Sequence, residues 1–230
     1  MSESGKKRLE QRICGSCGPC TERGLAASEC FGMLPGSDRE EMVQKPALLL
    51  HSCCGPCSTA VIERLADEFA ITVFYYNPCI TDEEEYLRRR DTQKAFLKAY
   101  QEKHPGETAI TFLEGSYRPG TFLQLVKGLE DEPEGGRRCH VCFRQRLEQT
   151  AMQAQMSGCD WFGTTLTVSP HKNYRKISEI GQEIALRYGL TFLDRDFKKK
   201  DGFKRSIELS KEYGLYRQNY CGCEFSKWQK

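Results

Sequence analysis

The stretch Ala47-Leu48-Leu49-Leu50-His51-Ser52-Cys53-Cys54-Gly55-Pro56-Cys57-Ser58 places an uninterrupted apolar run directly before three cysteines. Such a run, closed by Gly-Pro, is typical of a buried strand in a parallel sheet. Val61, Leu65 and Phe69 then follow at helical spacing and predict a helix over 58–69. The cysteines therefore lie on a strand-to-helix turn, where open α/β sheets bind ligands and a helix N-terminus favours thiolates.

The rest of the chain alternates between strand-like and helix-like segments. Strand composition recurs at residues 70–76, 108–113, 160–166 and 190–193. Helices are predicted between and after them, over 81–100, 122–129, 143–156, 177–185 and 203–213. Thr81, with Glu84 three residues later, is the expected N-cap of the first of these, and Gly189 ends the helix around 177–185. This alternation indicates an α/β fold with a doubly wound, parallel, five-stranded sheet.

Two regions are expected. Residues 1–45 are polar and without periodicity, which predicts a flexible N-terminal extension. Residues 46–230 form the α/β domain, ending in a tail that contains cysteines. The extension carries Cys14, Cys17 and Cys20, two overlapping Cys-x-x-Cys units that with Cys30 can close an extra metal site. The alternative is a loose tail whose thiols have no essential role.

Composition narrows the class of protein. The net charge is only +2, so no overall basic field indicates a nucleic-acid partner. No apolar run approaches membrane-spanning length, and no secretory signal is recognisable, so we expect a cytoplasmic protein without a membrane partner. Thirteen cysteines are an odd and high count. In a cytosolic chain, clustered Cys-x-x-Cys favours metal or redox chemistry over a disulfide scaffold.

Seven cysteines fall into three short groups, namely Cys53/Cys54/Cys57, Cys139/Cys142 and Cys221/Cys223. If the groups converge, they exceed the four thiols that one zinc ion or one cubane uses, which indicates a cluster plus a neighbouring metal or a redox pair. Cys139 and Cys142 share one helix face; a reducible disulfide of thioredoxin type is the alternative. Cys53 and Cys54 point in different directions if extended, so they need not serve one centre. We expect Cys159 to be a buried hydrophobe, and Cys79 can approach the site.

The C-terminal third is basic. Residues 171–230 contain fourteen Lys/Arg and eight Asp/Glu, a local excess of six positive charges. This predicts either a phosphate-binding face or an ordinary solvated helix surface.

Several unusual motifs occur in a fixed order along residues 47–226. They are Leu48-Leu49-Leu50-His51-Ser52-Cys53-Cys54-Gly55-Pro56-Cys57-Ser58, Phe74-Tyr75-Tyr76-Asn77-Pro78 with Glu85-Tyr86, Glu134-Gly135-Gly136-Arg137-Arg138-Cys139-His140-Val141-Cys142, Thr164-Thr165-Leu166-Thr167-Val168-Ser169-Pro170-His171-Lys172-Asn173, Asp196-Phe197-Lys198 and Tyr216-Arg217-Gln218-Asn219-Tyr220-Cys221-Gly222-Cys223. By these motifs the chain resembles the QueH family, the cobalamin-independent epoxyqueuosine reductases.

The resemblance implies a HUP-like fold, a [4Fe-4S] cluster and an adjacent metal ion, expected to be iron. It also implies the last step of queuosine synthesis, in which the epoxide of the modified wobble base of tRNA loses its oxygen as water. Cys139 and Cys142, with members of the other two groups, would hold the cubane, and the remaining thiols the lone metal. The electron donor is not identified by the sequence.

Asp196, Tyr220 and His171 are the candidate proton donors, since each lies near a strand or chain end. Each also has an ordinary structural interpretation, as a helix-start carboxylate, a packing residue or an RNA contact respectively. Contacts to anticodon-loop phosphates are expected from a basic set, namely Arg137, Arg138, Lys172, Arg175, Lys198 and Arg217.

Three alternatives stay open. A tRNA sulfur-transfer enzyme needs a Ser-Gly-Gly-x-Asp-Ser-like phosphate loop where this chain has Ser52-Cys53-Cys54-Gly55-Pro56-Cys57. A heterodisulfide-reductase-like module shares the Cys-Cys-Gly sequence but has its Cys-x-x-Cys much sooner. A zinc-stabilised RNA-binding module is the non-enzymatic alternative, which zinc without sulfide would indicate.

Overall fold

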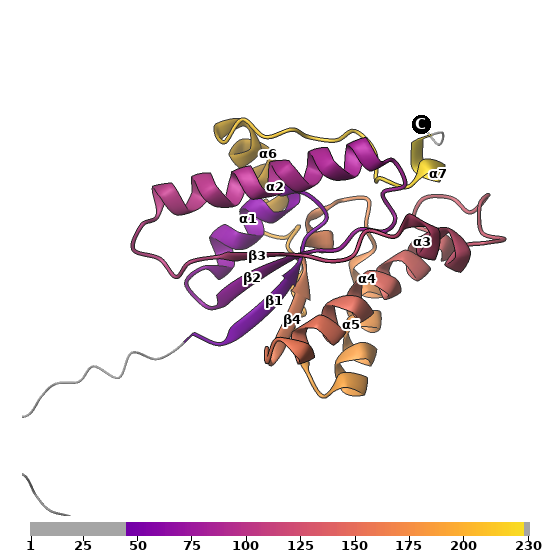
Figure 1. Ribbon diagram of the computed structural model, residues 1–230, viewed down its shortest axis with the longest axis horizontal. Helices are drawn as coiled ribbons and strands as arrows, with labels where there is room; N and C mark the ends of the chain where they lie inside the picture. Colours follow the sequence, from indigo (N-terminus) through magenta and orange to yellow (C-terminus); the bar gives the residue numbers. More distant parts are fainter. Residues whose placement is uncertain (1–44, 228–230) are drawn as a thin grey trace, which may run out of the picture. The chain divides into compact units, whose positions relative to one another are not determined.

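The computed structural model describes residues 45–227 (Figure 1). The expected N-terminal extension, with Cys14, Cys17, Cys20 and Cys30, lies outside the described residues apart from Lys45. The elements are β1 (Ala47–His51), α1 (Gly55–Leu65), β2 (Ala70–Tyr75), α2 (Glu83–Lys103), β3 (Thr111–Glu114), α3 (Pro119–Leu125), α4 (Arg137–Met156), β4 (Trp161–Thr164), the 3₁₀ helix η1 (Thr165–Val168), α5 (Tyr174–Tyr188), β5 (Thr191–Phe192), α6 (Gly202–Glu212) and α7 (Glu224–Lys227). No helix in this part of the chain is long and apolar enough to cross a membrane.

The five strands form one parallel sheet in the order β3-β2-β1-β4-β5. β1 is central, and Leu48 pairs with Ile71 of β2 on one side and with Trp161 of β4 on the other. The chain thus builds outward from β1 in one direction and then returns to build outward in the other. This confirms the predicted α/β fold with a doubly wound, parallel, five-stranded sheet.

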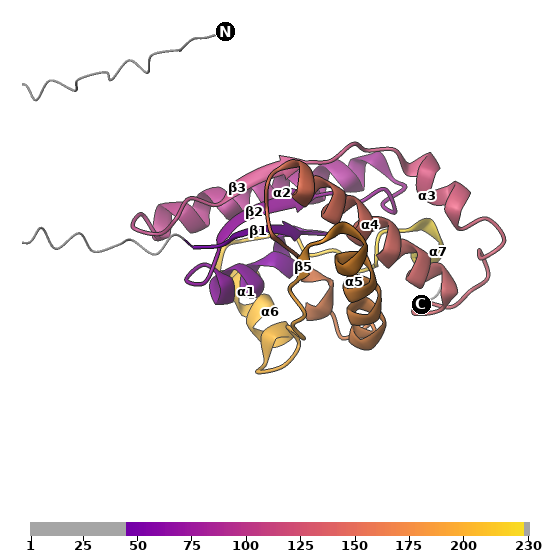
Figure 2. The ribbon, with the colours of Figure 1, turned by 90° about the horizontal axis from the view of Figure 1, so that it is seen from below.

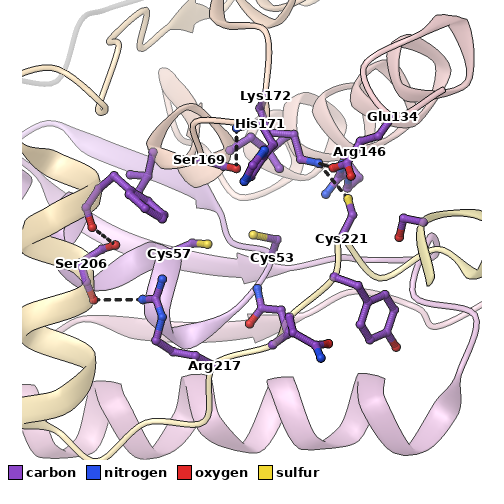
Figure 3. Close-up of a pocket in the computed structure, with 17 residues that line it drawn as sticks. Cys53, Cys57, Glu134, Arg146, Ser169, His171, Lys172, Ser206, Arg217 and Cys221 are labelled. Atoms are coloured by element: carbon purple, nitrogen blue, oxygen red, sulfur yellow. Dashed lines mark hydrogen bonds and ion pairs between the residues drawn. The ribbon is translucent and has the colours of Figure 1, made fainter. Parts of the chain in front are cut away.

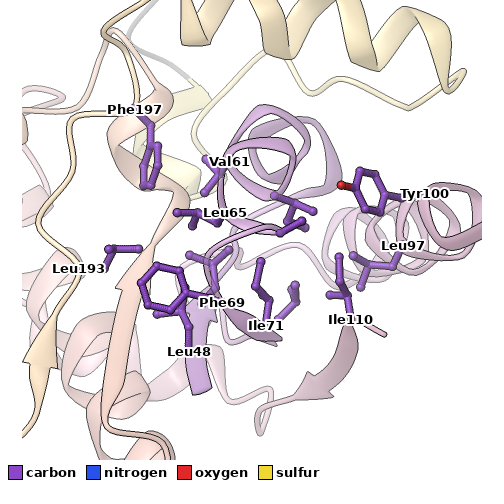
Figure 4. Packing of buried hydrophobic residues seen from close by; sticks show 14 of the residues in the cluster. Leu48, Val61, Leu65, Phe69, Ile71, Leu97, Tyr100, Ile110, Leu193 and Phe197 are labelled. Atoms are coloured by element: carbon purple, nitrogen blue, oxygen red, sulfur yellow. The ribbon is translucent and has the colours of Figure 1, made fainter. Parts of the chain in front are cut away.

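Helices cover both faces of the sheet. Figures 1 and 2 show α1, α2 and α6 on one face and α4 and α5 on the other. Because side chains alternate along a strand, Leu48 and Leu50 enter the first core, with Val61 and Leu65 of α1 (Figure 4). Leu49 enters the second core, under α4 and α5. Each fully buried leucine contributes roughly 1.5–3 kcal/mol to the stability of the fold. The three leucines of β1 therefore stabilise the packing of helices on both faces of the sheet.

Element boundaries differ from the prediction where polar groups or turns decide them. α1 begins at Gly55 rather than 58, with Pro56 in its first turn, so Cys57 lies on the helix itself. β4 ends at Thr164 because the Thr164 hydroxyl accepts the Leu166 N–H at 3.2 Å and starts a 3₁₀ turn. β5 spans only Thr191–Phe192. By contrast, α5 ends as predicted at Gly189, whose φ of 65° suits glycine.

The predicted cap of α2 is wrong by one residue. Asp82, not Thr81, precedes the helix, and its carboxylate accepts the Glu85 N–H at 3.2 Å. A carboxylate both satisfies a free N–H and complements the helix dipole, which a threonine hydroxyl does less strongly. The helix continues past residue 100 to Lys103 and ends at His104.

Candidate metal centre

A cavity of about 440 Å³ opens at the carboxyl edge of the sheet (Figure 3). Its walls come from the segments after β1 and β4, from α4 and α6, and from the C-terminal segment 217–221. The strand order reverses between β1 and β4, and such switch points are the usual ligand sites of open α/β sheets. The lining includes Cys53, Cys57, His171, Lys172, Arg217 and Cys221.

Cys53, Cys54 and Cys57, the first thiol group, lie where β1 passes into α1. Their Sγ atoms all lie within 4.8 Å of one another, and those of Cys53 and Cys54 are 3.8 Å apart. Four sulfurs at about 2.3 Å from one tetrahedral ion are separated by roughly 3.8 Å. The first thiol group is therefore spaced as three ligands of a single ion.

The expectation that Cys53 and Cys54 point apart is wrong. Cys54 is extended (φ −174°, ψ 158°), yet it is the N-cap residue of α1. The chain turns there from strand to helix, so the alternation of strand side chains does not continue across it. Both sulfurs consequently face the same region.

The three thiols differ in acidity. Burial opposes ionisation of Cys54, but hydrogen bonds from Cys53 and Cys57 hold its pKa well below the ordinary value. The charge of Arg89 and the Gln218 amide, whose Nε2 lies 3.0 Å from the Cys54 Sγ, act in the same direction. The hydrogen bond with Cys54 raises the pKa of Cys53, and the hydrogen bonds with Cys53 and Cys54 raise the pKa of Cys57. Cys54 is thus the first of the three to become a thiolate, the form that binds metal.

A second thiol group forms around the first turns of α4 and the C-terminal segment. Its members interact with one another electrostatically or by hydrogen bonding, and they are Cys79, Cys139, Cys142, Cys221 and Cys223. The Gly135 N–H donates to the Cys139 Sγ at 3.2 Å. All nine cysteines among residues 45–227 are free thiols, so the described part of the chain contains no thioredoxin-type disulfide.

Cys79, which was expected only to be able to approach the site, is a member of this group. Its thiol is hydrogen-bonded to Cys142, and both are buried beside Cys223. The Asn77-Pro78 turn positions it: the Asn77 side chain donates to the Ser52 carbonyl at 2.9 Å, which ties this loop to the end of β1. Cys159, by contrast, is buried in the second core, as predicted.

Arg89 anchors the segment that carries Gln218 and Cys221. Its guanidinium donates to the carbonyls of Cys221 at 3.0 Å and Tyr220 at 3.3 Å, and it pairs with Glu85 at 2.6 Å. Glu85 also accepts a hydrogen bond from the Tyr216 hydroxyl at 2.9 Å. The Glu85-Tyr86 motif was recognised in the sequence, but Arg89 was not, because an arginine on a polar helix gives no sign of a partner more than 130 residues away.

His51, the last residue of β1, is fully buried beneath the first thiol group. Its Nε2 donates to the Tyr76 carbonyl at 3.1 Å, so Nδ1 accepts from the Thr164 hydroxyl at 2.9 Å. Burial and the nearby charge of Arg146 lower the pKa of His51 to about 4. The ring is neutral at pH 7 and joins β1 to the end of β4.

Two of the three candidate proton donors line the cavity. His171 is exposed and Tyr220 is half-buried there, and burial raises the pKa of Tyr220. Asp196 is not part of the lining; its carboxylate lies 3.4 Å from the Lys198 ammonium instead. The structure therefore brings His171 and Tyr220 together with the thiols but leaves Asp196 outside.

Two of the expected phosphate contacts are internal. Arg138 is buried and donates to the carbonyls of Leu129, Glu130 and Glu132. Lys172 is buried between the Glu134 carboxylate at 2.8 Å and the Cys221 Sγ at 2.9 Å. Both residues correct the expectation, because the Lys172 ammonium and the Arg138 Nη1 already have partners within the protein, and the whole Arg138 side chain is buried.

The fold and the site define an α/β protein with a thiol-lined cavity at the switch point of a parallel sheet. The family model described as "Epoxyqueuosine reductase QueH" matches residues 48–229. The chain therefore belongs to the QueH family, and with it to the oxidoreductases.

Individual relatives support this assignment. The chain is 43% identical over 182 residues to epoxyqueuosine reductase QueH of Streptococcus pyogenes serotype M1, covering 79% of this chain and 71% of that protein. It is 42% identical over 185 residues to the protein of the same name from Staphylococcus epidermidis, covering 80% and 77%. It is 37% identical over 183 residues to epoxyqueuosine reductase QueH of Thermotoga maritima, covering 78% of this chain and 89% of that protein.

Proposed function

We propose that this chain reduces epoxyqueuosine at the wobble position of tRNA to queuosine, the last step of queuosine synthesis, in the cytoplasm. The observation that carries the proposal is the cavity whose walls include members of both thiol groups, Cys53 and Cys57 of the first and Cys221 of the second. A wobble base lies in a loop already, so splaying it into a cavity costs little.

The donor set fits a [4Fe-4S] cluster with an adjacent iron ion. Thiolates are the ligands of iron–sulfur clusters, and eight free thiols are gathered here in two groups. We assign the lone ion to Cys53, Cys54 and Cys57, because their spacing suits one tetrahedral ion. The cubane then falls to the four remaining predicted ligands, Cys139, Cys142, Cys221 and Cys223, without the contribution from Cys53 or Cys54 that the family resemblance implies.

When bound, the cluster supplies single electrons and the lone ion supplies Lewis acidity. The substrate takes up two electrons and two protons, and its epoxide oxygen leaves as water. His171 and Tyr220 are the proton donors that line the cavity, and Asp196 remains a predicted donor that lies outside it. Segment 217–221 lines one side of the cavity, while exposed Arg137, Arg175 and Arg217 are suited to contact tRNA phosphates.

The activity is tested with protein reconstituted anaerobically with iron and sulfide, reduced chemically, and given tRNA that contains epoxyqueuosine. Mass spectrometry of the nucleosides should show loss of one oxygen from the modified base without added cobalamin. Protein loaded with zinc alone is the control and should leave the base unchanged. An unchanged base on a fully loaded cluster would exclude the reductase function.

The ligand assignment is tested separately by metal analysis. Cys57→Ser should lower the iron content and leave acid-labile sulfide unchanged, whereas Cys142→Ser should remove both iron and sulfide. Cys159→Ser, in the second core, is the matched control and should change neither. Loss of sulfide from the Cys57→Ser protein would contradict the assignment.

The same analysis decides the remaining alternatives. Bound zinc without sulfide would favour the zinc-stabilised RNA-binding module. A requirement for ATP would favour tRNA sulfur transfer, although the loop after β1 has cysteines where that chemistry needs a phosphate cradle. Iron beyond that of the two proposed centres would indicate a further site on Cys14, Cys17, Cys20 and Cys30.

A further inference from the structure

Arg146 is a buried cation at the wall of the cavity. It lies on α4 one turn after Cys142, and only 2% of its surface is exposed. Its Nε donates to the Cys142 carbonyl at 3.3 Å, whereas its Nη2 is buried without a hydrogen-bond partner. Figure 3 shows its side chain beside Glu134, Lys172 and Cys221. Buried charges normally have complete sets of partners, so this guanidinium is incompletely satisfied, as is that of Arg138, whose Nε and Nη2 also lack a partner.

The charge of Arg146 also lacks an ion pair. Within residues 45–227, its guanidinium forms no salt bridge with a carboxylate. Two other buried cations at the site are paired, Arg89 with Glu85 and Lys172 with Glu134. A buried cation without a counter-charge is unfavourable, so negative charge supplied near Arg146 stabilises the site.

The groups around Arg146 identify that negative charge. Four thiols act electrostatically on the guanidinium, namely Cys142, Cys79 and Cys221 of the second thiol group and Cys53 of the first. Neutral thiols do not compensate a cation, but thiolates that hold a metal centre do. Arg146 therefore lies within electrostatic range of members of both thiol groups, and it shares the lining of the cavity with Cys53 and Cys221.

We propose that Arg146 is the counter-charge of the metal centre and raises the reduction potential of its cluster. Reduction adds one electron, and therefore one negative charge, to the cluster without forming or breaking a bond. A fixed cation in a poorly polarisable interior stabilises the reduced form more than the oxidised form. Arg146 is thus a positioning residue that acts through the cluster, and the inference rests on the metal centre of the proposed function.

The test compares three variants with the wild-type protein after anaerobic reconstitution. Arg146→Gln removes the charge, Arg146→Lys keeps it, and Arg144→Gln removes a partly exposed charge from the same helix, where Arg144 pairs with Glu183. Circular dichroism, iron and sulfide content are measured first. The cluster is then titrated with a chemical reductant and followed by absorbance and electron paramagnetic resonance.

We expect the potential of Arg146→Gln to shift to more negative values, while Arg146→Lys stays closer to the wild type and Arg144→Gln matches it. A fully loaded Arg146→Gln protein with the wild-type potential overturns the proposal. If the Arg146→Gln protein folds poorly or loses its cluster, the Arg146→Lys protein is decisive. A fully loaded cluster in Arg146→Lys supports the requirement for a positive charge at this position. Loss of the cluster from both variants overturns the proposal.

This titration contains no tRNA, so its outcome is independent of the substrate. An unreactive epoxyqueuosine tRNA together with a shifted potential would refute the proposed function but leave the role of Arg146 intact. Active wild-type protein, together with an unshifted potential in Arg146→Gln, would support the proposed function and refute the role of Arg146.

Discussion

Lys172 shows how a residue of a polar loop becomes part of the interior. Its ammonium joins the Glu134 carboxylate to the Cys221 thiol, and only 8% of its side chain is exposed. Burial disfavours the charged form, but Cys221 and Glu134 outweigh it and raise the pKa of Lys172 above its ordinary value. The residue therefore links the loop after β4 to the C-terminal segment.

Lys172→Met should destabilise the metal-free protein by about 2 kcal/mol, since hydrogen bonds to a charged group are lost. The larger penalty of a broken buried pair is not expected, because Glu134 is 34% exposed and reaches water. Urea denaturation measures the effect, with Arg175→Ala on the exposed start of α5 as the control. Equal stability of the Lys172→Met and wild-type proteins would show that the contacts of Lys172 contribute little.

Some residues of the site could be predicted from the sequence and others could not. Cys53, Cys54 and Cys57 were identified from sequence because strand, turn and helix signals surround them locally. Arg146, Arg89 and Gln218 were not, because the groups that give them a role come from distant parts of the chain. Lys172 was assigned to RNA for the same reason: sequence shows a charge but not its partner.

At the scale of elements, the cap of α2 offers a test that depends on pH. A hydrogen bond from Lys227 and the Glu85 N–H hold the pKa of Asp82 below its ordinary value. The folded state thus favours the carboxylate, so its contribution is complete above about pH 4 and is lost as the pH falls through the lowered pKa.

Asp82→Ala should cost about 1 kcal/mol of unfolding free energy at neutral pH, as expected for a lost helix cap. The difference from the wild type should shrink as the pH falls through the lowered pKa of the Asp82 carboxyl group. Urea denaturation at neutral and at acidic pH measures it. Thr81→Ala is the matched control, and a larger effect of that variant would restore the cap predicted from sequence.

The packing of α5 on the sheet depends on Gly181. A Cβ atom at this position would lie 2.5 Å from ring atoms of Phe192. Gly181→Ala should therefore destabilise the protein by about 1–3 kcal/mol through overpacking, although alanine normally favours a helix. Gly120→Ala in α3, where nothing lies within 4 Å, is the control and should be neutral or stabilising in thermal denaturation. Similar melting temperatures for the two variants would contradict this packing.

At the scale of the whole described domain, the sheet and its order of helices follow from the alternating pattern of the sequence. The path of residues 214–227 could not be predicted from that pattern, because this segment forms no strand and is held in position by Arg89, Glu85 and Gln218. The sequence could place cysteines at its end but not bring them to the cavity.

Arg89→Met should release this segment and cost about 3 kcal/mol, because it leaves Glu85 and two carbonyls without their buried partner. Hydrogen exchange should then increase in residues 214–227 more than in the sheet. The control is Arg88→Ala, whose guanidinium stacks on the Tyr216 ring at 3.6 Å without reaching those carbonyls. Unchanged exchange in the Arg89→Met protein would show that the segment is held by other contacts.

The central place of β1 has a consequence for synthesis of the protein. β1 and its partner β4 are separated by 113 residues, as in the His51–Thr164 contact, which a ribosome needs roughly 6–23 seconds to translate. During that interval β2 can pair with one edge of β1, and β3 with β2, while the other edge of β1, with Leu48, Leu49 and Leu50, has no partner. The nascent chain therefore exposes an aggregation-prone strand edge until its second half emerges, and we expect it to depend on chaperones in that period.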